Sequence, residues 1–211
     1  MELNNVFIEN ISYNTHGYPL TREKNYYRCI VSTNELNISD KTHIFSKIRY
    51  FNNEKKYIKT INIIQLNGVL LENQNFYVSF VPSTQYKYGL FSKKNLNFND
   101  ENPYKIGING VPIQSIPEDL SDIENSYLIY YGKKFHETFP DYSFIGIDYN
   151  PSHTKRLELT AFINNKVNGN LTLAVDYVEM TRKNSSFKQP IDIRVYFKQC
   201  RSIKEDDELF F

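Results

Sequence analysis

Residues that could hold a metal ion are few and widely spaced in this sequence. A zinc site needs imidazole or thiolate ligands at short, fixed spacings, such as two histidines on one helix face. The four histidines, in contrast, lie far apart, at His16, His43, His136 and His153. We therefore predict no metal site and expect the histidines in loops or at the surface. His136, between Phe135 and Glu137, is the best single candidate for a functional histidine.

Nucleophilic catalysis also lacks its usual sequence signals. The chain has no Gly-x-Ser-x-Gly motif, which would place a serine on a tight turn between a strand and a helix. Cys29 lies in an apolar run, so we expect a buried and unreactive thiol. Cys200 ends the last predicted strand, and we expect it to be partly exposed. A disulfide between the two would require the first and last strands to be neighbours, and the sequence leaves this open.

Three further kinds of site are weak or missing. The phosphate-binding pattern Gly-x-x-x-x-Gly-Lys-Ser/Thr is absent, and Gly107–Gly110 reads as a tight turn. The segment Asn97–Glu101 lacks the ligand spacing of a calcium loop, so we expect a solvated loop. Glu137, Asp141 and Asp148 could supply a carboxylate pair for glycoside hydrolysis, but the sequence does not fix their separation. We thus predict no catalytic, cofactor-binding or metal-binding residues and no enzymatic activity.

The last eight residues, Lys204–Phe211, are the most distinctive segment, with four acids followed by three apolar residues. Such a segment can dock on a partner, with a Phe ring in a pocket and the carboxylates against a basic rim. It resembles the acidic, Phe-terminated tails of bacterial and phage single-stranded-DNA-binding proteins, which implies recruitment of protein partners. The predicted partner-binding residues are Glu205, Asp206, Asp207, Leu209, Phe210 and Phe211. The alternative is an apolar terminus packed against its own domain or a neighbouring subunit.

Composition limits the class of protein that must position these residues. The chain has 211 residues, with 25 Lys+Arg against 24 Asp+Glu and a net charge of +1. This excludes a strongly basic packaging protein, because dense phosphate binding needs an excess of basic residues. No run approaches the ~18 apolar residues of a membrane span, and Met1–Asn10 shows no signal-peptide pattern. No linker divides the chain, so we predict one domain over 1–211 with a short tail at 204–211.

Period-two alternation of apolar and polar residues predicts many strands. Two alanines and many Ile, Tyr and Phe residues also favour strands over helices. In the C-terminal third, segment 156–164 and segment 170–180 are predicted to pair as a hairpin through Asn165–Gly169, and a further strand follows Pro190. Other predicted strands are Tyr26–Val31, Ile44–Phe51, Tyr57–Leu66, Phe76–Val81, Tyr127–Tyr131 and Phe144–Tyr149.

Turn and helix signals complete the expected fold. Asn67-Gly68, between two apolar runs, is a strong hairpin signal. Only one short helix is predicted, near 117–124, where a proline and two acids follow Ser115. Roughly ten short strands with little helix are typical of an antiparallel β-sandwich, and a viral-type jelly roll is one such architecture.

The absence of a catalytic constellation favours a structural or assembly protein. The Asn- and Ile-rich, Ala-poor composition is typical of AT-rich genomes, which include those of many viruses and phages. We therefore favour a virion component, such as a capsid, vertex or tail/fibre protein, in a virion or in the host cytoplasm. It would act through protein partners, as a homo-oligomer or in a larger assembly, without a cofactor or a membrane.

Two other functions fit parts of the sequence. A single-stranded nucleic-acid-binding protein could stack bases on sheet aromatics and recruit partners with its acidic tail, although the dispersed basic residues do not favour this. A carbohydrate-binding β-sandwich would display aromatic residues in loops. The candidate platforms for a sugar are Tyr86, Tyr88 and Tyr104.

Overall fold

The structure of the chain is a computed structural model. It describes residues 12–13, 19–23, 25–38, 41–66, 68–81, 88–109, 111–113, 128–139, 146–148, 158–181 and 188–211. Most of these residues lie in antiparallel strands, and one sheet curls into a half-barrel. The described residues also include one α-helix, α2 (Lys133–Thr138), and a 3-10 helix, η1 (Leu159–Phe162). The predicted antiparallel β class is therefore confirmed, while the sandwich or jelly-roll arrangement stays a prediction.

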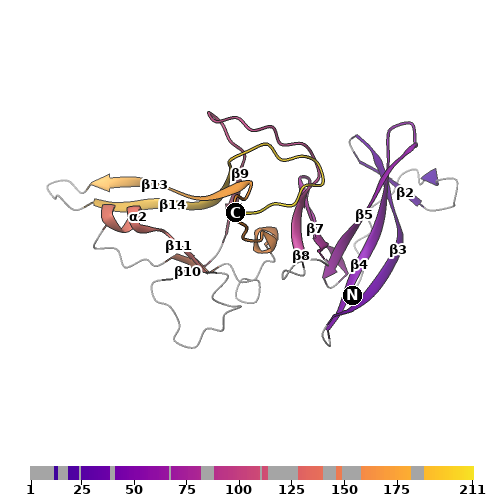
Figure 1. The fold of residues 1–211 in the computed structure, drawn as a ribbon, viewed down its shortest axis with the longest axis horizontal. Helices are drawn as coiled ribbons and strands as arrows, with labels where there is room; N and C mark the ends of the chain where they lie inside the picture. The colour runs from indigo at the N-terminus through magenta and orange to yellow at the C-terminus, as the bar shows by residue number, and fades with distance from the viewer. Residues whose placement is uncertain are drawn as a thin grey trace. The chain divides into compact units, whose positions relative to one another are not determined.

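The chain forms two compact units. Unit 1 comprises Met1–Asn73 and Tyr77–Tyr88, and unit 2 comprises Gln74–Phe76 and Gly89–Phe211. The strands β7 (Phe76–Phe80) and β8 (Tyr88–Ser92) form a two-stranded sheet (Figure 1) and contain two of the three points where the chain passes from one unit to the other. The single domain over 1–211 stays a prediction, because two compact units can still unfold in one cooperative step.

Unit 1 contains a six-stranded antiparallel sheet in which each strand pairs with the next one along the chain. Its strands are β1 (Ser12–Tyr13), β2 (Pro19–Arg22), β3 (Tyr27–Ile38), β4 (Lys41–Phe51), β5 (Tyr57–Leu66) and β6 (Val69–Leu70). The three strands that we predicted within 26–66 are confirmed, and β3 and β4 extend further than predicted. Short connections favour this order, since neighbouring strands then meet at little cost in loop entropy.

The hairpin between β5 and β6 follows the predicted Asn-Gly signal. Gly68 has φ of 79°, a left-handed conformation that glycine adopts without a steric penalty. Leu66 and Val69 pair directly across the turn. Within β5 the neighbours Ile63 and Ile64 are only 0% and 5% exposed. Because adjacent strand residues point to opposite faces, this part of β5 is buried on both sides.

One core cluster of unit 1 surrounds the cysteine of β3. Cys29 is 3% exposed and packs with Leu20 and Phe51, against which Tyr27 and Val31 also pack. Burial raises the pKa of the Cys29 thiol, because a thiolate would lose its hydration there. The predicted burial of this thiol is confirmed. The structure contains no disulfide between Cys29 and Cys200.

Unit 2 contains two three-stranded antiparallel sheets. One has the order β13-β14-β9, with β13 (Leu171–Thr181), β14 (Lys188–Gln199) and β9 (Lys105–Ile108). The other has the order β10-β12-β11, with β10 (Val111–Ile113), β12 (Gly146–Asp148) and β11 (Leu128–Tyr130). The strands predicted at 170–180 and after Pro190 are confirmed as β13 and β14. Strands also lie within the predicted segments 127–131 and 144–149.

The C-terminal segment is part of the fold of unit 2. Leu209 is fully buried, and its N–H donates to the Leu90 carbonyl at 2.8 Å. At the chain end, Phe211 N–H donates to the Asn164 carbonyl at 3.1 Å, and the Phe211 carbonyl accepts a 2.9 Å bond from Lys166 N–H. The terminus therefore links β8 to the loop that follows η1.

The strand predicted over 156–164 is wrong in its described part. Residues 159–162 form η1, which is closed by bonds from Ala161 N–H to the Glu158 carbonyl and from Ile163 N–H to the Thr160 carbonyl. The predicted hairpin partner, β13, pairs with β14 instead. Four alternating apolar residues are too few to separate a strand from a tight helical turn, because long-range pairing decides the outcome.

Two further turn and helix predictions have different outcomes. Gly107 and Ile108 do not form a tight turn but belong to β9, which pairs with β14. The helix predicted near 117–124 lies outside the described residues. No helix in the described part of the chain is long and apolar enough to cross a membrane.

Candidate functional site

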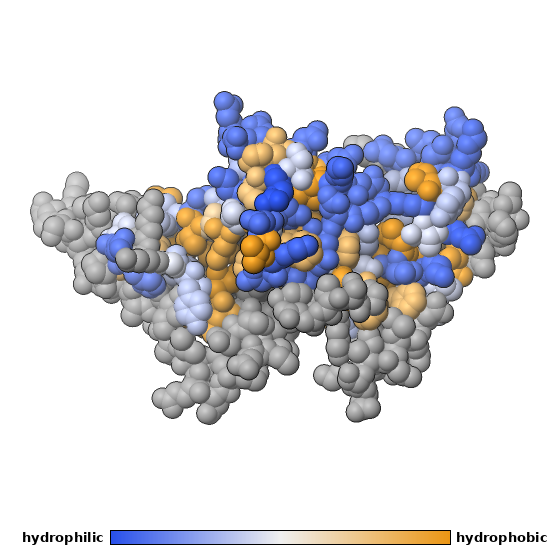
Figure 2. All heavy atoms as spheres, in the orientation of Figure 1, coloured by the Kyte–Doolittle hydropathy of each residue, from blue (hydrophilic) through white to orange (hydrophobic). Residues whose placement is uncertain are grey.

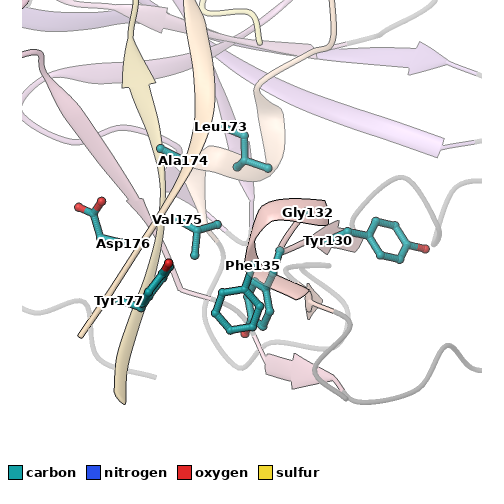
Figure 3. A pocket seen from close by; sticks show the side chains of 9 residues that line it. Tyr130, Gly132, Phe135, Leu173, Ala174, Val175, Asp176 and Tyr177 are labelled. Carbon is teal, nitrogen blue, oxygen red and sulfur yellow. The ribbon is translucent and has the colours of Figure 1, made fainter. Parts of the chain in front are cut away.

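One candidate site is a pocket of about 590 Å³ in unit 2, between β13 on one side and β11 and α2 on the other (Figure 3). This volume falls in the range of roughly 300–1,000 Å³ that small-molecule sites occupy. Its lining residues are Tyr130, Tyr131, Gly132, Phe135, Leu173, Ala174, Val175, Asp176 and Tyr177.

The β13 side of this pocket is positioned by strand alternation. Leu173, Val175 and Tyr177 project from one face of β13 toward α2, whereas Asp176 projects from the opposite face (Figure 3). The sequence predicted that these three apolar residues share a face, because strand side chains alternate. Alternation therefore gives the pocket an apolar wall and turns the Asp176 side chain toward the other face of the strand.

The other side is an aromatic cluster centred on α2. The Phe135 ring centroid lies 4.9 Å from that of Tyr131, 5.1 Å from that of Phe139 and 5.6 Å from that of Tyr177. The crossing angles are tilted or edge-on, which is the favoured geometry for aromatic pairs. Burial raises the pKa of the Tyr131 phenol above its ordinary value, so this hydroxyl stays protonated at neutral pH.

Sequence reasoning missed this cluster, although the signal was present. Tyr131, Phe135 and Phe139 are spaced by four residues, which places them on one side of a helical segment. Only His136 and Glu137 had been singled out there. The His136 ring is half-buried and makes an edge contact with Phe135, with centroids 5.8 Å apart. The described contact of His136 is therefore a packing contact and does not indicate a catalytic role.

A charged pair lies on the outer face of β13. The Lys105 ammonium is 3.1 Å from the Asp176 carboxylate and 4.4 Å from the centre of the Tyr196 ring. The pKa of Asp176 is lowered, first by a hydrogen bond from the Tyr196 hydroxyl and then by Lys105. Because both charged side chains are well exposed, the pair contributes little to stability.

Unit 1 has its own charged cluster, arranged across three strands. Arg28 in β3 pairs with Tyr50 in β4, which pairs with Lys59 in β5, so the three side chains share one face. The Arg28 guanidinium contacts Glu72 at 2.6 Å and Glu23 at 3.1 Å. Side-chain exposure is 22% for Arg28 and 10% for Glu72, so this pair is largely shielded from water.

The ionisation of this cluster follows from its burial. Burial acts to lower the pKa of Arg28, but the charge and hydrogen bond of Glu72 outweigh it and raise that pKa. The pKa of Tyr50 is raised by burial and then by the Glu72 charge, while Arg28 opposes the shift. Arg28 therefore stays charged and Tyr50 neutral. Two carboxylates already contact the guanidinium, which leaves it poorly suited to bind an added anion.

The predicted partner-binding residues of the tail take two positions. The apolar tip packs on unit 2: the Lys166 ammonium lies 4.6 Å from the Phe210 ring, and the Phe211 ring lies 5.0 Å from that of Phe197. The acidic residues Glu205, Asp206 and Asp207 are exposed. The tip therefore takes the alternative arrangement, against its own unit. Docking of a partner by the six tail residues stays a prediction.

The described part of the chain contains no group of three or more His, Cys, Asp or Glu side chains that could hold a metal ion. Of the candidate catalytic carboxylates, Glu137 is exposed on α2, and Asp141 lies outside the described residues. Asp148 is in β12, but its side chain is not described.

Comparison with known proteins does not assign a family. No protein-family model matches the chain, and no curated protein matches it. The case for a function therefore depends on the geometry of the two units themselves.

Proposed function

We propose that this protein is a non-enzymatic structural or assembly protein that acts through protein–protein contacts, as a virion component such as a capsid, vertex or tail/fibre protein would. The observation that carries the proposal is a set of large apolar side chains open to solvent in both units. Figure 2 shows one face of the molecule, on which hydrophobic residues in orange lie among hydrophilic residues in blue. These residues are Ile30, Tyr57, Ile58, Leu66, Val69, Tyr130, Val167, Leu173 and Val178.

The exposed apolar residues of unit 1 concentrate on β5 and its hairpin. Tyr57 and Ile58, at the start of β5, are 60% and 51% exposed, and the cross-strand pair Leu66 and Val69, at its end, is 47% and 64% exposed. A cross-strand pair presents both side chains to the same side of a sheet. Full burial of one such side chain contributes about 1.5–3 kcal/mol, so this pair can contribute substantially to an interface.

The polar cluster in unit 1 supports a structural rather than a catalytic role. Arg28 is held by Glu72 and Glu23 in a fixed arrangement, which fits a residue that stabilises the sheet. Catalytic bases and nucleophiles, in contrast, need a pKa shifted toward neutrality and access to a substrate. The described part of the chain offers no such pair.

The test is the native mass of the full chain and of a variant with a polar hairpin. We expect the wild-type protein to form oligomers or larger particles, and the double variant Leu66→Ser/Val69→Ser to shift toward the monomer. Asn62→Ser is the matched control, since Asn62 is exposed in the same strand but polar. A double variant that assembles like the wild type, while both fold normally, would show that this hairpin is not the contact surface.

One observation favours a second candidate, single-stranded nucleic-acid binding. Three lysine ammonium groups of unit 2 lie over aromatic rings: Lys94 over Tyr104 at 5.9 Å, Lys105 over Tyr196 at 4.4 Å and Lys166 over Phe210 at 4.6 Å. Rings beside basic groups can stack bases while the cations contact phosphates.

An oligo-dT binding assay at two salt concentrations separates the two candidates. The assembly proposal expects no specific affinity, even at low salt. Affinity that falls steeply as salt rises would instead favour nucleic-acid binding, because each neutralised phosphate releases counterions.

A further inference from the structure

A second pocket in unit 2 has the opposite character to the aromatic one. It also has a volume of about 590 Å³, but its lining is dominated by amide and lysine side chains around one tyrosine. The side chains that could contact a ligand are Lys94, Asn95, Asn97, Asn102, Tyr104 and Lys105. All of them lie in one unit, in segments joined by the hydrogen bonds described next.

A buried glutamine holds the two segments that form this pocket. Gln199 is 1% exposed; its side-chain nitrogen donates to the Leu96 carbonyl at 2.7 Å, and its side-chain oxygen accepts from Tyr104 N–H at 3.3 Å. Gln199 N–H also donates to the Tyr104 carbonyl at 2.9 Å. Segment 94–97 and segment 102–105 are thus tied to the same side chain of β14. Such fixed walls reduce the conformational entropy that a ligand would have to remove on binding.

The tyrosine is held in a defined position as well. The Tyr104 hydroxyl accepts a 2.8 Å bond from the Asn75 side chain, and its ring meets Phe76 edge-on with centroids 6.0 Å apart. Burial raises the pKa of Tyr104, an effect that Asn75 partly opposes, so its phenol is neutral. Tyr104 therefore offers an apolar ring and a polar tip, which together suit a ligand with apolar and hydroxyl-bearing faces.

The amides provide both donors and acceptors. Asn97 and Asn102 are exposed at the pocket, and Asn95 uses its side-chain oxygen to accept from Glu205 N–H at 2.9 Å, which leaves its NH₂ group to donate. An amide side chain carries two donors and a carbonyl acceptor. This combination can bond neighbouring hydroxyl groups of a sugar, because each hydroxyl both donates and accepts a hydrogen bond.

The charge distribution disfavours an anion as the main ligand. Lys105 is already paired with Asp176 at 3.1 Å. Asp100 and Glu101 lie in the turn between the two pocket segments, and the backbone N–H of Glu205 donates to the Asn95 side chain, which brings Glu205 next to the pocket. These acids offset the lysines, so a neutral polar ligand fits better than a phosphate.

We propose that the pocket lined by Asn95, Asn97, Asn102 and Tyr104 binds a carbohydrate of one or two sugar units. The Tyr104 ring contacts an apolar face of the sugar, and the asparagine amides bond its hydroxyl groups. Lys94 is exposed at the rim, where it can donate to a further hydroxyl or to the carboxylate of an acidic sugar. The site is independent of the apolar surfaces proposed for assembly.

Saturation-transfer NMR on the full chain tests this directly, with N-acetylglucosamine, galactose and N-acetylneuraminic acid as separate probes. We expect at least one sugar to bind with a dissociation constant on the order of 1 mM. Asn97→Ala and Asn102→Ala should each weaken binding by roughly 3- to 10-fold, the usual effect of losing one hydrogen bond. Asn165→Ala, an exposed asparagine elsewhere in unit 2, is the matched control and should bind normally.

Two results would overturn the proposal. One is that no sugar in the panel shows saturation transfer. The other is that sugars bind equally well to the Asn97→Ala, Asn102→Ala and Asn165→Ala variants. Inorganic phosphate serves as the anion probe: if it binds at the same place and displaces the sugar, while Lys94→Ala abolishes both signals and the asparagine variants do not, the pocket is an anion site instead.

Discussion

Unit 1 and unit 2 join their strands over very different distances along the chain. In the unit 1 sheet every strand pairs with its neighbour in sequence. In unit 2, β9 pairs with β14, and Gln199 bonds to the Leu96 carbonyl 103 positions away. The tail adds further contacts of this kind, such as the bridge between Phe91 and Glu208. Unit 2 should therefore depend on a few distant residues, whereas unit 1 depends on its hairpins.

The largest expected effect is in the tail. Leu209→Ala should lower the free energy of unfolding of unit 2 by about 2–5 kcal/mol, because it leaves a cavity at a fully buried position. Hydrogen exchange followed by mass spectrometry should show faster exchange in unit 2 peptides, with unit 1 peptides less affected. Val167→Ala is the control, since Val167 is 87% exposed and should change neither unit. Equal exchange in the Leu209→Ala variant and the wild type would contradict a structural role for the tail.

The counterpart in unit 1 is the ion pair of Arg28. Arg28→Met should destabilise the protein by roughly 1–3 kcal/mol, because it leaves the shielded Glu72 carboxylate without its cation. Urea denaturation measures this loss. Lys56→Met breaks an exposed pair with Glu54, with side chains 76% and 69% exposed, and should cost less than about 0.5 kcal/mol. Similar losses in both variants would mean that burial does not distinguish the two pairs.

A glycine beside the tail gives an effect of similar size that is more local. A Cβ at Gly169 would lie 2.6 Å from the Phe210 carbonyl oxygen, so Gly169→Ala should displace the terminus and cost about 1–3 kcal/mol. A Cβ at Gly107 in β9 would meet nothing within 4 Å, so Gly107→Ala is the matched control and should be nearly neutral. Thermal unfolding of the two variants checks the contrast. If Gly169→Ala has the same melting temperature as the wild type, the tail backbone can move without a cost in stability.

The smallest effect is a pH dependence from the tail. Burial raises the pKa of Glu208, although the hydrogen bond from Asn164 and the charge of Lys166 oppose the shift. An acid with a raised pKa favours folding while it is protonated, so its contribution falls as pH rises from about the ordinary value of 4.5. Glu208→Gln removes this dependence. The melting temperature of the variant should therefore rise relative to that of the wild type as the pH is raised from 4 to neutrality. A constant difference would contradict the shift.

Local patterns predicted much of unit 1. Asn67-Gly68 predicted the β5–β6 hairpin, and alternating apolar residues predicted β4 and β5, because both signals act between neighbours in sequence. The Arg28–Glu72 pair had no such signal, since its partners are 44 positions apart. The face of β13 that carries Leu173, Val175 and Tyr177 was also predicted, because alternation within one strand needs no partner.

Unit 2 was predicted less well for the same reason. The segment around Leu159 alternates like a strand, but β14 pairs with β13 and β9, and the segment forms η1 instead. No sequence pattern indicated the second pocket of unit 2, which Gln199 holds together. Gln199 and Tyr104 meet only after β9 and β14 pair. Tyr104 had been named only as one of three candidate sugar platforms.

The most direct test of the assembly proposal is sedimentation velocity on the full chain over a wide range of protein concentrations. The proposal predicts species heavier than the 25.0 kDa monomer, whose fraction rises with concentration. A single 25.0 kDa species at every concentration would contradict self-assembly through the exposed apolar surfaces.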